Sequence, residues 1–313
     1  MPFRSTARYL RSILIPQWTS LRMLYIDLVK QACVGWMNDR APTMGAALAF
    51  YSAFAIAPLL IIVIAIAGAI WGADAARGAI VGELAGMVGV TAAEAIQGLL
   101  KAAQQTTTGV YAAIVGIATT LVAATTLVVE LQDDLNYIWK APTRPGSGLA
   151  SLIRARILSL GMILAIGFLL LISLIASGAL VAFETYFRSY FPRTALLLLQ
   201  LSDAILSLSL ETVLFAILYK WLPDVRIAWK DVWIGALISA LLFSVGRVAI
   251  GLYLGRSAIA SAYGAAGALA VLLLWLYYSA QVFLLGAEFT CIHANFRRRR
   301  LARAFELQRH AIE

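Results

Sequence analysis

The stretch YGAAGALAVLLLWLYYSAQVFLLGA, residues 263–287, decides the fold of this chain. It contains no Asp, Glu, Lys or Arg. An α-helix rises about 1.5 Å per residue, so about 20 apolar residues cross the hydrocarbon core of a bilayer. The stretch is far longer than a strand of a transmembrane barrel, and its apolar residues do not alternate with polar ones. It therefore predicts a transmembrane α-helix.

Five further segments are long apolar runs, namely 45–71, 109–129, 157–183, 195–219 and 232–254, and the last two of them carry charged residues. The whole chain of 313 residues is 62% hydrophobic and 13% charged, whereas ordinary soluble domains are about 45–50% apolar and about 25% charged. A soluble core cannot bury so much apolar surface, but lipid can solvate it. We therefore expect an all-α polytopic membrane bundle of about six transmembrane helices.

The basic residues predict how the bundle is oriented. If the N-terminus is cytoplasmic, 19 of the 25 Lys and Arg residues fall in inner segments and five in outer ones. Because basic loops are retained in the cytoplasm, we expect both termini inside a bacterial cytoplasmic membrane. Residues 1–40 would form a cytoplasmic amphipathic segment, 41–296 the membrane domain and 297–313 a basic tail. Short helices would cap the bundle within 72–108, where 78–90 could equally be re-entrant.

The net charge of +9 has a simple explanation in this topology. The surplus cations lie beside the cytoplasmic membrane face, where anionic headgroups attract them. We expect lipid rather than nucleic acid as the partner, with headgroup anchors at Arg297, Arg298, Arg299 and Arg300.

Three charged residues lie inside the expected spans. A charge within hydrocarbon costs about 2.5–3.5 kcal/mol on insertion scales, so it needs a partner or a polar cavity. Counted from the outer span ends at about 1.5 Å per residue, Asp203 lies about 12 Å deep and Arg247 about 10 Å. We expect these two to pair and thereby fix helix order. Glu211, about 24 Å deep, would lack a cation and bind a proton or a headgroup among Ser207, Tyr277, Tyr278 and Gln281.

Several motifs in a fixed order resemble the YihY/BrkB family of bacterial inner-membrane proteins, once labelled ribonuclease BN. The resemblance covers residues 34–296 and implies a bundle of about six helices with an envelope-linked activity, but no catalytic residue. The motifs are DRAP at 39–42, AALAFYS at 46–52, APLL at 57–60, LNYIW at 135–139, LPD at 222–224, WK at 229–230, YGAAG at 263–267, LWLYYS at 274–279 and GAE at 286–288.

The residue inventory argues against an enzyme. Metal-dependent phosphodiester hydrolysis needs clustered histidines and carboxylates, and this chain has two histidines. Glu130, Asp133 and Asp134 could bind a cation, but we interpret them as a solvated helix end. We expect no cofactor and no bound metal. The leading hypothesis is a transporter or flippase-like permease for an envelope component such as an anionic lipid or lipid precursor. The alternative is a non-transporting scaffold that supports envelope integrity, and the oligomeric state stays open.

Overall fold

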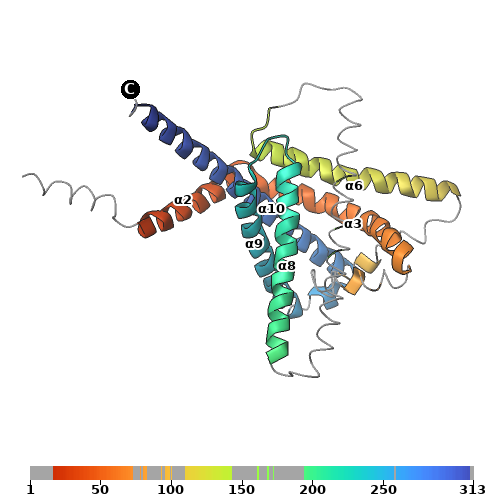
Figure 1. Ribbon diagram of the computed structural model, residues 1–313. Coiled ribbons are helices and arrows are strands. Elements are labelled where there is room, and N and C mark those ends of the chain that lie inside the picture. Colours follow the sequence, from red (N-terminus) through yellow and green to blue (C-terminus); the bar gives the residue numbers. More distant parts are fainter. Residues whose placement is uncertain are drawn as a thin grey trace, which may run out of the picture.

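A computed structural model describes residues 17–72, 110–142, 194–256 and 259–310, together with 78, 80–82, 93, 96–98, 100, 161, 168 and 172. The regular secondary structure of these residues is entirely helical. The helices drawn in Figure 1 are α2 (Gln17–Asn38), α3 (Ala41–Trp71), α6 (Val110–Ile138), α8 (Thr194–Trp221), α9 (Trp229–Arg256) and α10 (Ile259–His310). The all-helical prediction is confirmed.

Three described segments are long and apolar enough to cross a membrane, namely Ala204–Trp221, Trp229–Ile250 and Leu269–Arg300. A shorter apolar segment, Ala41–Ile56, lies in α3. The expected span at 157–183 falls almost wholly outside the described residues, so the number of spans stays a prediction. Beyond the C-cap residue Gly72, the described residues between α3 and α6 are helical. The rest of the expected capping helices, including most of 78–90, lies outside the described part.

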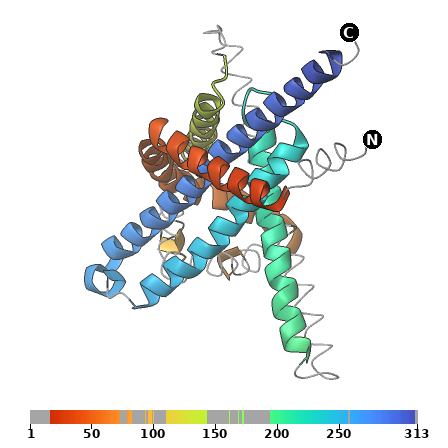
Figure 2. The same cartoon turned by 90° about the vertical axis from the view of Figure 1, so that its left-hand side faces the viewer.

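Helix α10 is the centre of the arrangement. It packs against α2, α3, α6 and α9, while α8 packs on α9 and α3 on α6. In Figures 1 and 2 the α2–α3 turn, the end of α6 and the α8–α9 connection gather around α10. From there α3 and α6 run in one direction, and α8 and α9 run in another. The helices therefore converge at the end of the bundle that the sequence predicts to face the cytoplasm.

Small residues allow α8, α9 and α10 to approach closely. The fully buried hydroxyl of Tyr219 lies 2.8 Å from the Ser239 hydroxyl and donates a 2.7 Å hydrogen bond to the Phe283 carbonyl. A Cβ added to Gly286 would lie only 1.8 Å from Ser239 Oγ, and one added to Gly235 would lie 1.7 Å from Thr290 Oγ1. These glycines are needed because hydroxyl side chains of the neighbouring helix occupy the space.

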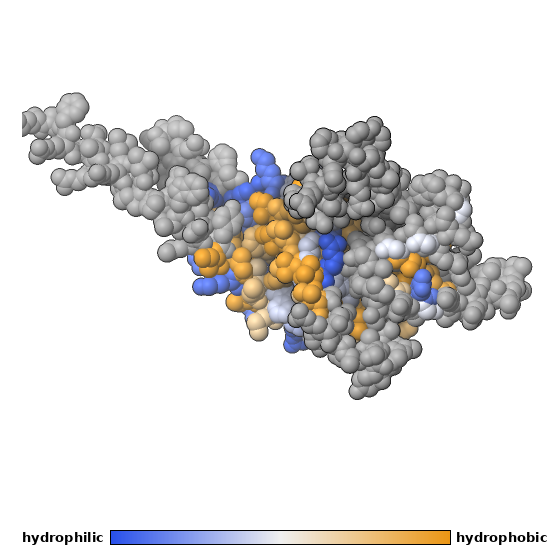
Figure 3. All heavy atoms as spheres, turned by 90° about the horizontal axis from the view of Figure 1, so that it is seen from below, coloured by the Kyte–Doolittle hydropathy of each residue, from blue (hydrophilic) through white to orange (hydrophobic). Residues whose placement is uncertain are grey.

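One face of α9 exposes large apolar side chains at intervals of three and four residues, which is helical spacing. Val245 and Val248 are 65% and 61% exposed. Apolar side chains also gather on the face of the molecule that the space-filling view shows (Figure 3). Such a stripe has the character of a lipid-contacting face. Its residues are Trp229, Trp233, Leu237, Leu241, Val245, Val248 and Leu252.

Candidate functional site

The charge inside α9 pairs with a different carboxylate from the one we expected. Arg247 Nη1 lies 3.4 Å from Glu211 Oε1 across the α8–α9 interface. Ser244 on α9 donates a 2.8 Å hydrogen bond to Glu211 Oε2. The Glu211 side chain is 5% exposed and the Arg247 side chain 28%. The expectation that Glu211 lacks a cation is therefore wrong.

The register of α8 on α9 explains the difference. Along this interface Tyr219 meets Ser239, Phe215 meets Phe243 and Glu211 meets Arg247, so each step is four residues on both helices. The two helices are staggered by eight residues relative to their connection, because Tyr219 lies two residues before Trp221 whereas Ser239 lies ten residues after Trp229. Our depth estimate instead aligned the outer ends of the two spans, although α8 continues outward past the end of α9. Counting from the connection does not give the pair either, because Glu211 lies 10 residues before Trp221 and Arg247 lies 18 residues after Trp229.

The other predicted site residues are only partly gathered around this pair. Tyr278 donates a 2.7 Å hydrogen bond to the Leu242 carbonyl and lies against Gly246, where an added Cβ would meet its ring at 1.9 Å. Gln281 is directed to α3 instead, where its amide donates to the Ala41 carbonyl at 3.4 Å. Ser207 and Tyr277 are half-buried. The side chain of Asp203 lies outside the described residues.

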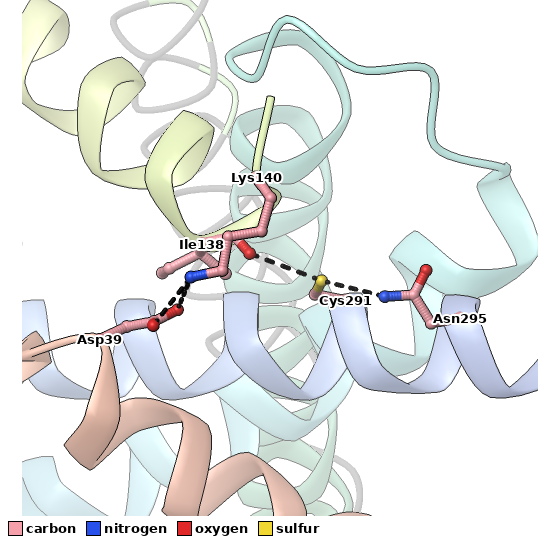
Figure 4. A network of polar contacts seen from close by, with 5 residues as sticks. All are labelled: Asp39, Ile138, Lys140, Cys291 and Asn295. Carbon is pink, nitrogen blue, oxygen red and sulfur yellow. Dashed lines mark hydrogen bonds and ion pairs between the residues drawn. The ribbon is translucent and has the colours of Figure 1, made fainter. Parts of the chain in front are cut away.

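A second polar cluster lies where the helices converge, and Figure 4 shows part of it. Lys140, just beyond α6, donates to both carboxylate oxygens of Asp39 in the α2–α3 turn, at 2.7 and 2.8 Å. Arg40 and Lys140 have φ angles of 57° and 50°, and they are the described non-glycine residues in the left-handed region. Such backbone strain persists where surrounding contacts enforce it. We call Asp39, Asn136, Lys140, Asp224, Asp231, Glu288 and Arg297 the polar junction.

Asn136 and Asp224 bring α6 to the α8–α9 connection. The Asn136 amide donates to Asp224 Oδ2 at 3.1 Å, and its oxygen accepts from the Asp224 backbone N–H at 2.8 Å. Both residues belong to motifs that carry the family resemblance. Two motifs that lie 88 residues apart in the sequence are therefore in contact in space.

Asp231 joins the start of α9 to the end of α10. Its carboxylate is 2% exposed and lies 2.9 Å from Arg297 Nη2 and 3.7 Å from His293 Nε2. Arg298 donates to the Arg226 carbonyl at 3.1 Å. Arg297 and Arg298 thus bind protein groups, which the lipid-anchor prediction did not include. Arg299 and Arg300 are exposed, and lipid contact stays a prediction for them.

Sequence reasoning named Arg297 alone of the junction residues as a site residue, and Glu288 on α10 is one of those that it missed. It is 4% exposed, and its Oε1 has no hydrogen-bond partner among the described residues. Among the described residues, Asp39 and Lys140 are the charged groups that act on it. A Cβ added to Gly35 of α2 would lie 2.8 Å from Glu288 Oε2. The available signal was the carboxylate of the GAE motif directly after an uncharged span.

The carboxylates near the end of α6 differ from one another. Asp133 is exposed, as expected for a solvated helix end, but Asp134 is 6% exposed. Burial, together with the nearby Glu130 and Asp133, raises the pKa of Asp134 to about 7. The solvated interpretation is therefore wrong for Asp134. Among the described residues no three His, Cys, Asp or Glu side chains are grouped so that they could hold a metal ion.

Its long apolar helices and its relatives make this chain a multi-pass helical membrane protein. Residues 32–310 match the family model described as virulence factor BrkB. The chain belongs to this family, which confirms the resemblance seen in the motifs.

The curated relatives are described as UPF0761 membrane proteins. One from Ralstonia nicotianae is 30% identical over 252 residues, which cover 80% of this chain and 55% of the relative. One from Azotobacter vinelandii is 28% identical over 263 residues, 82% of this chain and 60% of the relative. One from Yersinia pestis is 29% identical over 191 residues, 60% of this chain and 61% of the relative. The chain thus spans less than two thirds of their lengths. No solved structure matches.

Proposed function

We propose that this protein is a permease of the bacterial cytoplasmic membrane that moves an anionic lipid or lipid precursor of the cell envelope across the bilayer. The proposal includes the bundle of about six spans with both termini inside, which the basic residues predict. The observation that carries it is the Glu211–Arg247 pair within two apolar spans.

A buried ion pair is an expensive way to join two helices. Replacing such a pair by packed apolar residues is often neutral or stabilising, so rigidity alone gives little reason to keep it. Charged residues within spans commonly mark substrate or ion pathways. Here Arg247 is the more exposed partner, at 28%, and Glu211 Oε1 has no hydrogen bond among the described residues. This guanidinium is therefore the group that can leave its partner.

The chemistry of Arg247 indicates the substrate class. A guanidinium presents a planar fork of donors that matches two phosphate oxygens, and it stays charged at any physiological pH. A lipid phosphate that replaces Glu211 would keep Arg247 paired within the membrane. Glu211 would then be left to Ser244 and to a proton, because a buried carboxyl without a cation favours its neutral form.

The scaffold hypothesis has one observation in its favour. Ser244 and Arg247 together give both oxygens of Glu211 a polar neighbour, so the pair could be a fixed cross-link between α8 and α9. The two functions differ in whether lipid moves and whether the movement depends on these charges.

A lipid-translocation assay separates them. Purified protein is reconstituted into phosphatidylcholine vesicles with NBD-labelled phosphatidylglycerol, and external dithionite reduces only dye that reaches the outer leaflet. We expect wild-type protein to expose inner-leaflet dye. The neutral double variant Glu211→Gln with Arg247→Gln should lose this activity, because it leaves no charge buried but removes the phosphate-binding group.

The matched control is Lys230→Gln, which removes an exposed cation from the same helix α9 and should translocate like wild type. Each vesicle preparation is compared with protein-free vesicles for leakage. If wild-type protein leaves the inner-leaflet dye protected, or if the double variant moves lipid as fast as wild type, the Glu211–Arg247 transport proposal fails and the scaffold is favoured.

A further inference from the structure

Three tryptophans gather where α8 connects to α9. Trp221 ends α8, Trp229 begins α9 and Trp233 follows about one turn later. The ring centroids of Trp221 and Trp229 lie 5.9 Å apart at an interplanar angle of 89°, and those of Trp229 and Trp233 lie 6.4 Å apart. The three residues are 58%, 44% and 45% exposed. We call this row of exposed rings the tryptophan ladder.

Cations lie beside the tryptophan ladder. The ammonium group of Lys220 donates a hydrogen bond to the Ile227 carbonyl and lies 5.5 Å from the centre of the Trp229 ring, which is within the range of a cation–π contact. Arg298 on α10 donates to the carbonyl of the residue before Ile227, which is the exposed Arg226. Cationic residues from α8, α10 and the connection therefore meet at this corner.

The acidic residues of this part of the chain do not cancel that charge. Asp231 is 2% exposed and is paired with Arg297. Asp224 is hydrogen-bonded to Asn136 of α6, and it is one carboxylate against several cations. The corner therefore keeps a net positive charge that complements an anionic ligand.

The hydrogen-bonding chemistry of the corner also indicates what binds there. An ammonium group and indole N–H groups donate hydrogen bonds and accept none, so a suitable ligand supplies acceptors. Phosphate and ester oxygens of a phospholipid are acceptors, and the phosphate adds the negative charge. Tryptophan is enriched at membrane–water interfaces because its ring is apolar and its N–H is polar. The tryptophan ladder thus suits the headgroup region of a bilayer.

The exposed apolar face of α9 continues from the ladder into the span. Leu237 and Leu241 follow Trp233 at intervals of four residues and are 45% and 48% exposed. One leaflet is about half of a hydrocarbon core of about 30 Å, and about ten helical residues rise through it. An acyl chain that begins beside Trp233 therefore covers both leucines. A soluble phosphate has no group to place on this surface, so the occupant is a lipid.

We propose that Lys220 and the tryptophan ladder form a binding site for a resident anionic phospholipid of the leaflet at this end of the bundle. The Lys220 ammonium binds the lipid phosphate, the indole N–H groups bind ester oxygens, and an acyl chain lies along Leu237 and Leu241. The site is separate from the Glu211–Arg247 pair, since Glu211 lies about 15 Å along α8 from Trp221. The inference therefore does not rest on the proposed transport.

Native mass spectrometry of the full chain in detergent measures the binding. Dioleoyl phosphatidylglycerol or dioleoyl phosphatidylcholine is titrated, and the dissociation constant of the first bound lipid is determined for each. We expect wild-type protein to bind phosphatidylglycerol several-fold more tightly than phosphatidylcholine. Lys220→Gln should weaken phosphatidylglycerol binding about fivefold, the usual effect of one basic residue near an anionic surface, and leave phosphatidylcholine binding unchanged. The matched control is Lys30→Gln, which removes an exposed cation from α2 and should keep the preference.

A second variant keeps the test informative if Lys220→Gln does not fold. Trp221 is the most exposed residue of the ladder, at 58%, and Trp221→Phe keeps an aromatic ring but removes the indole N–H. It should weaken the binding of both lipids. Phosphatidylglycerol constants equal to those of wild type in the folded variants would overturn the proposal.

Two further results would assign the corner to another occupant. Displacement of phosphatidylglycerol by excess glycerol 3-phosphate would show a site for soluble phosphate. A lipid-free dimer that Trp229→Ala converts to a monomer would show a contact between two copies of the chain. Either result overturns the lipid site. The readout is lipid binding rather than lipid movement, so the proposed transport function stands or fails separately.

Discussion

Arg247→Ala is expected to lower the free energy of unfolding by about 3–5 kcal/mol, which is the typical cost of breaking a buried ion pair from one side. The variant leaves Glu211, 5% exposed, without its cation 3.4 Å away. Ser244 still donates one hydrogen bond to this carboxylate, but a hydroxyl does not neutralise its charge. The measurement is reversible unfolding in mixed detergent micelles.

The double variant Glu211→Ala with Arg247→Ala should be more stable than Arg247→Ala alone, because no uncompensated charge remains. A double-mutant cycle measures this coupling. The same cycle with Asp203→Ala in place of Glu211→Ala is the control, and its effects should add, because the helix register brings Glu211 to Arg247. Additive effects for Glu211 and Arg247, or strong coupling for Asp203 and Arg247, would show that this register is wrong.

Gly286→Ala is expected to destabilise the bundle by about 1–3 kcal/mol or more, as overpacking of a filled core does. The new Cβ would lie 1.8 Å from Ser239 Oγ and 2.4 Å from Tyr219 Oη. Tyr219 is fully buried and cannot retreat without losing its hydrogen bonds to Ser239 and Phe283. The thermal unfolding midpoint in detergent should fall accordingly.

Gly98→Ala is the matched control. No atom of the described residues lies within 4 Å of the Cβ position of this helical glycine, and alanine favours a helix over glycine by up to about 1 kcal/mol. It should be neutral or slightly stabilising. Equal thermal unfolding midpoints for Gly286→Ala and Gly98→Ala would mean that α8, α9 and α10 pack less closely than in the structure.

The class of fold could be predicted because long apolar runs have few physical solutions. The run at 263–287 lies wholly inside α10, which the structure extends to Ile259–His310. We expected a separate basic tail from residue 297, but the helix continues through Arg297–Arg300. Arginine is a good helix former, and Asp231 binds Arg297 against the bundle. The boundary between span and tail is therefore a change of environment within one helix.

The polar sites could be predicted only in part. The intramembrane positions of Glu211 and Arg247 follow from the sequence, since a charge in an apolar run is visible. Their pairing does not, because α8 and α9 are staggered by eight residues in the structure. The meeting of Asp39 with Lys140, and of Gly35 with Glu288, does not follow either. It joins three segments that meet only because α2 and α6 both pack on α10, and helical periodicity does not state which helices are neighbours.

The central claim is that a membrane bundle of about six spans holds its polar junction on the cytoplasmic side, and site-directed cysteine labelling tests it most directly. In a background with Cys33→Ser and Cys291→Ser, single cysteines are introduced as Gln105→Cys, in the expected outer connection, and as Ser147→Cys, in the expected inner one. Intact spheroplasts are treated with a membrane-impermeant maleimide, and lysed cells show that both sites can react. We predict labelling of Gln105→Cys and protection of Ser147→Cys until lysis. Labelling of Ser147→Cys with protection of Gln105→Cys would place the junction outside and contradict the account.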